Sequence, residues 1–167
     1  MKLETIRDRL VEAIQKAEKV TSKNATLPVL KCVLLEAKDS SLLVRSTNLD
    51  IGLEIKIPVK VQEEGSTAIP GNILSSFISQ LNNEKSITLE SKEGTLSVNS
   101  SKNSTTIKSF NTEDYPTIPK VDEDTSKSFK ISATSLVSGL KAVWYSSATS
   151  TIKPELSSVR MYPLDGN

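Results

Sequence analysis

The spacing of apolar residues changes along the chain, and each change predicts a different element. After a short extended start at residues 2–5, Ile6, Leu10, Ile14 and Ala17 recur every three or four positions. This spacing predicts a helix over residues 6–19 whose apolar side packs inward.

A strict two-residue alternation follows further along. Every second residue from Ile51 to Val61 is apolar, which predicts a strand with one buried and one solvated face. Pro58 lies within it and cannot donate a ladder hydrogen bond, so it should occupy a sheet edge or a bulge. Apolar runs at 32–35 and 42–44, separated by a turn at 38–40, predict two earlier strands.

The same order of elements then begins again. A strand is predicted at 66–69, and Pro70 and Gly71 open a helix. The apolar face of this helix is formed by Leu74, Phe77, Ile78 and Leu81. Three further strands are predicted at residues 86–89, 96–98 and 105–108. A strand, helix and three-strand unit therefore occurs twice, which predicts an α+β domain with a pseudo-twofold repeat.

Prolines and acidic residues mark a change near residue 114. Pro116, Pro119 and the run 122–124 are typical of a linker. We therefore expect domain limits of 1–118 and 128–167, with a linker at 119–127.

The pattern starts a third time after this linker. It predicts a strand at 129–132, a helix at 133–147 and another strand from 159 to 162. The helix would turn Leu136, Leu140, Val143 and Trp144 inward, so Trp144 is interpreted as a core residue and not as a ligand platform. About 40 residues cannot enclose a core without disulfides or metal, so a longer parent protein is expected.

Composition narrows the possible functions. The chain of 167 residues is 37% hydrophobic and 25% charged, which is typical of a globular protein. It has no histidine, six scattered glycines and a single cysteine, Cys32, in an apolar run. Most hydrolytic triads, zinc sites and phosphate loops are thereby excluded. We expect a cytoplasmic protein without catalytic residues, metal, cofactor or membrane anchor.

The charge balance gives no global reason to bind nucleic acid. The 21 basic and 20 acidic residues leave a net charge of +1. Any nucleic-acid contact must therefore come from local clustering of basic side chains.

Local strings add a family resemblance that extends over essentially the whole chain. They are TLPVL at 26–30, TNLD at 47–50, EDYP at 113–116, FKI at 129–131 and KPELSSV at 153–159. In this order and spacing they resemble the bacterial sliding clamp, the beta subunit of DNA polymerase III.

The resemblance implies a DNA-clamp fold, with antiparallel sheets outside and helices on one inner face. It implies a processivity factor that encircles duplex DNA and tethers the replicative polymerase. Its partners would be double-stranded DNA, bound weakly and without sequence preference, a second clamp subunit, the clamp loader and DNA polymerase. The partner-peptide pocket of the family would be incomplete here.

The resemblance also suggests site residues. On the first helix and the loop after it, the candidates for phosphate contacts are Arg9, Lys16, Lys19, Lys23 and Asn24. Each is equally compatible with an ordinary solvated side chain, because acidic residues share this helix. Many clamps have an arginine at the position of Asn24 and basic residues in the second helix, which is uncharged here.

The ring junction of the family predicts a second set. It comprises Ile73, Phe77 and Leu81 on the second helix, and Lys102, Ser104, Thr105 and Ile107 on the last strand. Of the helix residues, Ile73 lies off the main apolar stripe and is the one most suited to an interface.

Two other readings stay open. A β-rich interaction or scaffold module unrelated to replication is compatible with the neutral charge. An enzyme would have to use paired carboxylates such as Glu63 and Glu64, or Asp122 and Asp124, but adjacent acids in turns are usually solvated.

Overall fold

The computed structural model of the chain describes residues 1–22, 27–82, 84–119, 130–150 and 152–162. It divides into two compact units, Met1–Lys120 and Val121–Asn167, and each is considered by itself. The predicted linker falls almost entirely outside the described residues, so the predicted domain limits stay a prediction.

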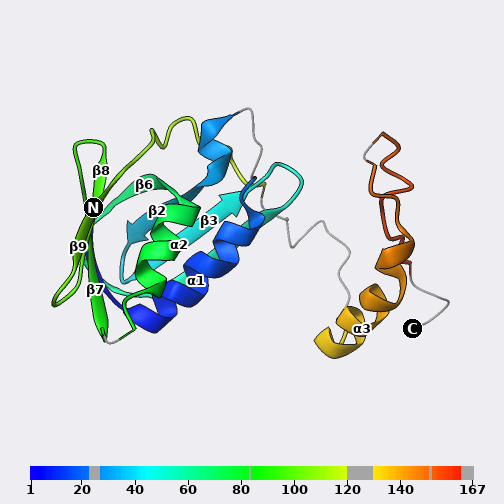
Figure 1. Cartoon of the computed structure of the whole chain (residues 1–167), viewed down its shortest axis with the longest axis horizontal. Helices are drawn as coiled ribbons and strands as arrows, with labels where there is room; N and C mark the ends of the chain where they lie inside the picture. Colours follow the sequence, from blue (N-terminus) through cyan, green and yellow to red (C-terminus); the bar gives the residue numbers. More distant parts are fainter. Residues whose placement is uncertain (23–26, 83, 120–129, 151, 163–167) are drawn as a thin grey trace. The chain divides into compact units, whose positions relative to one another are not determined.

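The first unit contains two successive series of elements (Figure 1). The first series consists of β1 (Lys2–Ile6), α1 (Arg7–Val20), a short 3-10 turn (Pro28–Lys31), β2 (Cys32–Lys38), β3 (Ser41–Thr47), β4 (Gly52–Pro58) and β5 (Lys60–Glu63). The second series consists of β6 (Gly65–Pro70), α2 (Gly71–Ser79), β7 (Ser86–Lys92), β8 (Thr95–Asn99) and β9 (Ser104–Lys108). The α+β class and the repeated order of elements predicted from the sequence are confirmed.

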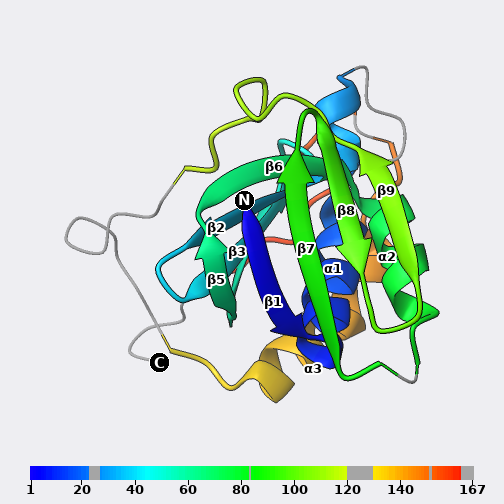
Figure 2. The same ribbon diagram turned by 90° about the vertical axis from the view of Figure 1, so that its left-hand side faces the viewer.

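These strands form two antiparallel sheets. The five-stranded sheet has the order β5-β1-β7-β8-β9 and is seen face on in Figure 2, and the four-stranded sheet has the order β4-β3-β2-β6. Each series therefore lends its first strand to the three-stranded meander of the other. Beside β6, where symmetry would place a counterpart of β5, a single bridge joins Ala68 to Phe110.

The pairing register shows that the two series are related by a pseudo-twofold. Ile6 lies opposite Ser86 in the β1–β7 pair, and Pro70 lies opposite Cys32 in the β6–β2 pair. Pro70 follows Ile6 by 64 positions and Ser86 follows Cys32 by 54, and both offsets hold along the two ladders. The predicted internal repeat is thus confirmed residue by residue.

Turns between equivalent strands repeat as well. Asp39 between β2 and β3 has φ 54°, and Glu93 between β7 and β8 has φ 48°. Left-handed backbone is uncommon outside glycine, so its recurrence 54 positions apart is a further sign of duplication.

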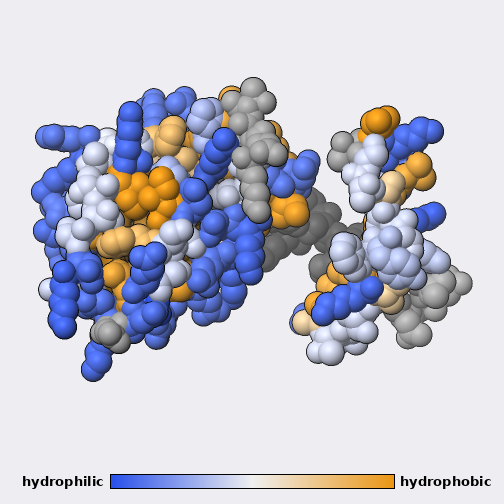
Figure 3. Space-filling model, in the orientation of Figure 1, coloured by the Kyte–Doolittle hydropathy of each residue, from blue (hydrophilic) through white to orange (hydrophobic). Residues whose placement is uncertain are grey.

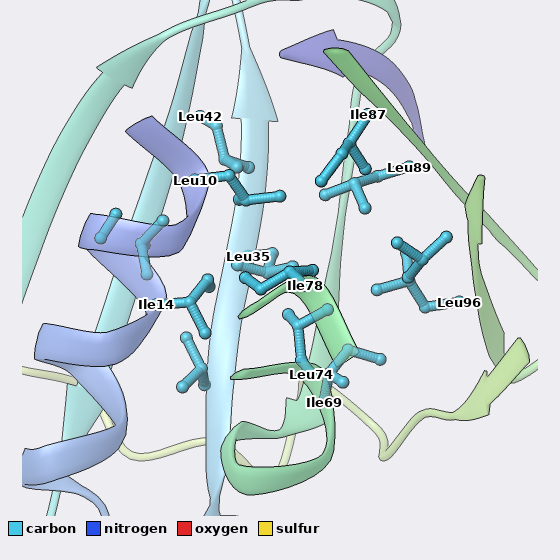
Figure 4. Close-up of a cluster of buried hydrophobic side chains, with 14 of the residues drawn as sticks. Leu10, Ile14, Leu35, Leu42, Ile69, Leu74, Ile78, Ile87, Leu89 and Leu96 are labelled. Carbon is cyan, nitrogen blue, oxygen red and sulfur yellow. The ribbon is translucent and has the colours of Figure 1, made fainter. Parts of the chain in front are cut away.

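Equivalent positions also fill one shared core between the two sheets and the helices (Figure 4). The fully buried equivalents are Leu10 and Leu74, Ile14 and Ile78, Leu35 and Leu89, Leu42 and Leu96, and Val44 and Val98. Because each half contributes the same positions, neither half encloses this core alone.

The long alternating segment becomes two strands. It breaks after Pro58, so that β4 ends one sheet and β5 ends the other, which confirms the predicted edge position of this proline. Ile57 is its one buried apolar side chain, whereas Ile51 lies outside the strand and is exposed. The prediction for Ile6 was wrong: it ends β1, the helix begins one residue later, and the side chain is half exposed.

The second unit contains α3 (Ala133–Val143) followed by a 3-10 turn (Trp144–Ser146). The strands predicted at 129–132 and 159–162 are absent at every position that the structure describes. Trp144, predicted to be buried, is 64% exposed. The described residues of this unit provide no sheet against which the apolar stripe of α3 can pack, which accounts for these differences.

Candidate nucleic-acid interface

The two helices of the first unit lie side by side, as both ribbon views show. They run antiparallel, because Arg7 at the start of α1 contacts the end of α2, and Gly71 at the start of α2 lies against Glu18 and Thr21 near the end of α1. A Cβ atom on Gly71 would come within 3.0 Å of the Val33 side chain and 3.7 Å of the Glu18 Cα. The absence of a side chain at Gly71 therefore permits the start of α2 to lie close against Val33 of β2.

Arg7 fastens the other end of the helix pair. Its guanidinium donates to the Ser79 carbonyl at 2.9 Å and to the Asn82 amide oxygen at 3.1 Å, and it pairs with Asp8 at 2.9 Å. The side chain is only 15% exposed. Sequence reasoning missed this role, because nothing in the local pattern indicates which distant carbonyl a helix-start arginine will reach.

The solvent-facing surface of the pair is nearly neutral. On α1 it carries Asp8, Arg9, Glu12, Gln15, Lys16 and Lys19, and on and just after α2 it carries Asn72, Ile73, Ser76 and Gln80. Over its whole length α1 has four basic and three acidic residues, whereas α2 has none. Local clustering of positive charge, which the sequence left as the only electrostatic route to nucleic acid, is therefore slight.

The structure describes three of the five predicted DNA-facing residues. Arg9, Lys16 and Lys19 are all exposed on α1, while Lys23 and Asn24 lie outside the described residues. Arg9 and Lys16 border a small surface hollow with Ile55 and Ile57 of β4. They consequently lie on the flank of α1 that adjoins β4.

Lys16 already has an anionic partner. Its ammonium group lies 2.7 Å from the carboxylate of Glu12, one helical turn earlier. The hydrogen bond and the charge of Lys16 lower the pKa of the Glu12 carboxyl below its ordinary value. The spacing of four residues between an acid and a following lysine is a signal of such a pair that the sequence does contain.

The predicted ring-junction residues lie on and next to α2 and β9. In the five-stranded sheet β9 is an end strand on which Ser104 is exposed and Thr105 is half-buried, whereas Lys102, predicted on this strand, is exposed in the turn before it. Ile107 is only 4% exposed because its side chain belongs to the core, so a partner could reach only its backbone.

The helix part of this junction is mixed. Ile73 is 50% exposed and Phe77 is half-buried, whereas Leu81 is buried. Figure 3 shows an apolar patch over α2, surrounded by hydrophilic side chains. Ile73 and Phe77 are thus accessible to a partner and Leu81 is not.

The side chains that could in principle act in catalysis are buried or hold a turn in place. Burial raises the pKa of the Cys32 thiol to about 11, and burial likewise raises the pKa of Tyr115 to about 12. The Glu64 carboxylate accepts a hydrogen bond from the Asp39 backbone at 2.9 Å and so braces a turn. Among the described residues no three acidic or cysteine side chains gather in a way that could hold a metal ion. In the same part of the chain no helix is both long and apolar enough to cross a bilayer.

Residues 1–119, which make up the first unit almost completely, match the family described as DNA polymerase III beta subunit, N-terminal domain. The chain belongs to the DNA polymerase III beta subunit family. The match covers both series of strands and helices and ends where the first unit ends.

Individual relatives extend the likeness beyond the first unit. The chain is similar to the beta sliding clamp of Synechococcus elongatus, with 22% identity over 163 residues that cover 96% of this chain and 43% of the relative. It is 27% identical to the beta sliding clamp of Streptomyces coelicolor over 126 residues, covering 75% of this chain and 33% of the relative. The chain therefore spans less than half the length of these curated relatives.

Solved structures show the same fold. The sliding clamp of Bacillus subtilis matches with a TM-score of 0.86 at 23% identity, over 92% of this chain and 42% of that one. A Helicobacter pylori beta clamp bound to a DNA ligase peptide matches with a TM-score of 0.79 at 24% identity, over 93% of this chain and 43% of that one. At these identities the likeness is one of fold.

Proposed function

We propose that this chain is part of a sliding clamp, a non-catalytic processivity factor that encircles duplex DNA and tethers a replicative DNA polymerase. The observation that carries the proposal is the duplicated unit with both helices on one face, in a chain that belongs to the beta subunit family. A ring built from such units can turn its helices inward and its sheets outward.

Retention on DNA would then be topological. A closed ring cannot leave a duplex sideways, so each contact with the phosphates can be weak and independent of sequence. The nearly neutral helix surface suits that task, because strong phosphate contacts would slow sliding. Arg9, Lys16, Lys19, Lys23 and Asn24 are the proposed phosphate-facing residues of this chain.

The rest of the function depends on partners. The proposed partners are a second clamp subunit, a clamp loader and a DNA polymerase, which would meet the chain in the cytoplasm. The Helicobacter pylori relative bound to a DNA ligase peptide supports a role in recruiting other replication proteins. Because this chain spans 43% or less of the first curated relatives, these activities belong to the proposal for the whole protein.

The proposed ring junction uses the flank formed by α2 and β9. The free edge of β9 can pair with a strand of another subunit, since an end strand presents unpaired backbone groups. Lys102, Ser104 and Thr105 would frame that edge, and the half-exposed Ile73 would add apolar contact. Ile107 would contribute through its backbone.

One observation favours a second candidate. The balance of charges on α1 and the absence of charge on α2 also suit a protein partner, as in a β-rich interaction or scaffold module. A direct test of what faces the helices separates the two functions.

The test places a photo-reactive amino acid at Lys19 on α1 and, in a separate variant, at Lys56 on β4. Both side chains are exposed, but Lys56 alternates with the inward-facing Ile55 and Ile57 and so lies on the outer face of its sheet. Irradiation with duplex DNA at low salt should crosslink the Lys19 variant and leave the Lys56 variant free. Equal crosslinking at both positions, or none at Lys19, would contradict a DNA-facing helix surface.

A further inference from the structure

The Glu12–Lys16 pair lies in the middle of the surface proposed to face DNA. The Lys16 side chain is 59% exposed and the Glu12 side chain is 69% exposed, and their charged atoms are 2.7 Å apart. A glutamate carboxyl is ionised at neutral pH, and the hydrogen bond and charge of Lys16 lower the pKa of Glu12 further. The partner of Lys16 is thus a permanent negative charge on the same helix.

The other basic residues of α1 differ from Lys16 in their contacts. Arg7 is held by Ser79 at the end of the second helix and by Asn82 just after it, and is not free to contact a ligand. Arg9 and Lys19 form no ion pair with any residue within the described ranges. Of the exposed basic residues of this helix, Lys16 is therefore the one that must leave a carboxylate, that of Glu12, before it can contact a phosphate.

We propose that Glu12 limits the affinity of the helix surface for duplex DNA by occupying Lys16. This inference rests on the proposed function. A lysine that contacts a phosphate gains its free energy from releasing the counterions condensed on the DNA. When Glu12 already neutralises Lys16, that contact must replace an existing ion pair, and the carboxylate also repels the phosphates.

The strength of the pair fits such a role. An exposed ion pair is weak because water screens it, so it lowers affinity without abolishing it. Glu12 thereby makes Lys16 a weak and quickly exchanging contact, which is what a protein that slides along DNA requires. Lys16 also borders the hollow beside β4, so its side chain has room to move between Glu12 and a phosphate.

Asp8 provides a matched control. It is an exposed carboxylate one turn before Glu12 on the same helix, and it is paired with Arg7 at 2.9 Å. Asp8→Asn removes the same charge as Glu12→Gln, but the arginine that it releases stays bound to the second helix. The two variants therefore separate a general change in charge from the release of a usable cation.

The experiment measures binding of the whole chain, residues 1–167, to a fluorescently labelled duplex as salt is raised from about 20 mM. Glu12→Gln should bind about fivefold tighter at the lowest salt and steepen the logarithmic salt slope by about 0.9. Asp8→Asn should change affinity by about twofold at most and leave the slope as in the parent chain. In a Lys16→Gln background the effect of Glu12→Gln on the slope should vanish.

The outcomes separate the inference from the function on which it rests. If Glu12→Gln and Asp8→Asn changed the affinity and the salt slope equally, while Lys19→Gln weakened binding, the proposed role of Glu12 would be wrong. The proposed DNA-facing surface would still hold. Absence of binding by every form at the lowest salt, including Glu12→Gln, would contradict both the role of Glu12 and the DNA-facing surface of α1. Unchanged thermal unfolding of the variants would show that the differences do not come from loss of the fold.

Discussion

Gln15 on α1 donates a hydrogen bond to the Ser79 hydroxyl on α2 at 3.2 Å, and the two residues occupy the same position in the two halves of the duplicated unit. They are 64 positions apart, which is the offset that relates β1 to β6. Only residues near a twofold axis can contact their own equivalents, so this bond marks the pseudo-twofold axis of the first unit. The helix pair is thus the centre about which the rest of the unit repeats.

That symmetry predicts equal effects of equivalent core mutations. Ile14 and Ile78 are both completely buried, one on each helix, in the same core. Ile14→Ala and Ile78→Ala should each lower the free energy of unfolding by about 2–5 kcal/mol, because each leaves a cavity in a core that both halves share. Urea unfolding followed by circular dichroism measures both values, and a tenfold smaller effect at either position would contradict a shared core.

The close approach of Gly71 to Val33 predicts the result of enlarging this glycine. Gly71→Val should destabilise the first unit by about 1–3 kcal/mol, because the new side chain meets Val33 and the end of α1. Gly139 in α3 has nothing within 4 Å of an added Cβ. Gly139→Ala is the control and should increase helix stability by about 0.5–1 kcal/mol. If Gly71→Val unfolded at the same urea concentration as the parent chain, Gly71 would not lie as close to Val33 of β2 as described.

The buried thiol and phenol predict a loss of stability at high pH. Burial raises the pKa of Cys32 from 9.0 to about 11 and the pKa of Tyr115 from 10.0 to about 12. Both groups stay protonated in the folded chain at a pH where the unfolded chain has lost the proton. Their contribution is complete below pH 9 and is lost as the pH rises toward 12.

Tyr115→Phe isolates the upper part of this window. The Tyr115 hydroxyl lies 3.3 Å from the carbonyl oxygens of both Cys32 and Arg45, so the variant should lose about 0.5–1.5 kcal/mol at neutral pH. Between pH 10 and 12 the stability of the variant should fall less steeply than that of the parent chain. Parallel curves of unfolding free energy against pH would show that Tyr115 ionises as easily when folded as when unfolded.

Some of this architecture is readable from the sequence and some is not. The alternation around Ile55 and the helical spacing around Ile14 are local, so they predict the elements and even their repetition. The exchange of β1 and β6 between the two sheets could not be predicted, because the sequence of a strand does not specify which distant strand it pairs with. For the same reason Arg7 was overlooked as the residue that joins the helices.

Burial was the weaker part of the prediction. A helical stripe shows which side of a helix is apolar, but it does not show whether anything covers that side. Trp144 lies on such a stripe and is 64% exposed, whereas Ile107, expected at an interface, is 4% exposed. The helical stripe suggested the first assignment and the family resemblance the second. No described strand of the second unit covers Trp144, whereas the core of the first unit encloses the side chain of Ile107 and leaves only its backbone to a partner.

Removal of single charges from α1 tests the proposed DNA-facing surface itself. If Lys16 and Lys19 each contact a phosphate, as the resemblance implies, the loss of either contact should remove about 0.9 from the logarithmic salt slope. The pairing of Lys16 with Glu12 changes that expectation, since Lys16 is neutralised locally and Lys19 forms no ion pair with any residue that the structure describes. Lys19→Gln should therefore reduce the slope by about 0.9, and Lys16→Gln by clearly less.

Titrations of the two variants and the parent chain with one labelled duplex provide the comparison, with Lys56→Gln on the outer face of β4 as the control. All three substitutions remove one positive charge, so a purely global charge effect would shift the three curves together. A reduction confined to the helix variants, and larger for Lys19, requires that the duplex lies against α1 and that Glu12 screens Lys16 there. If Lys56→Gln reduced the salt slope as much as Lys19→Gln, binding would depend only on the overall charge of the chain. That result would contradict a contact between DNA and the helix surface.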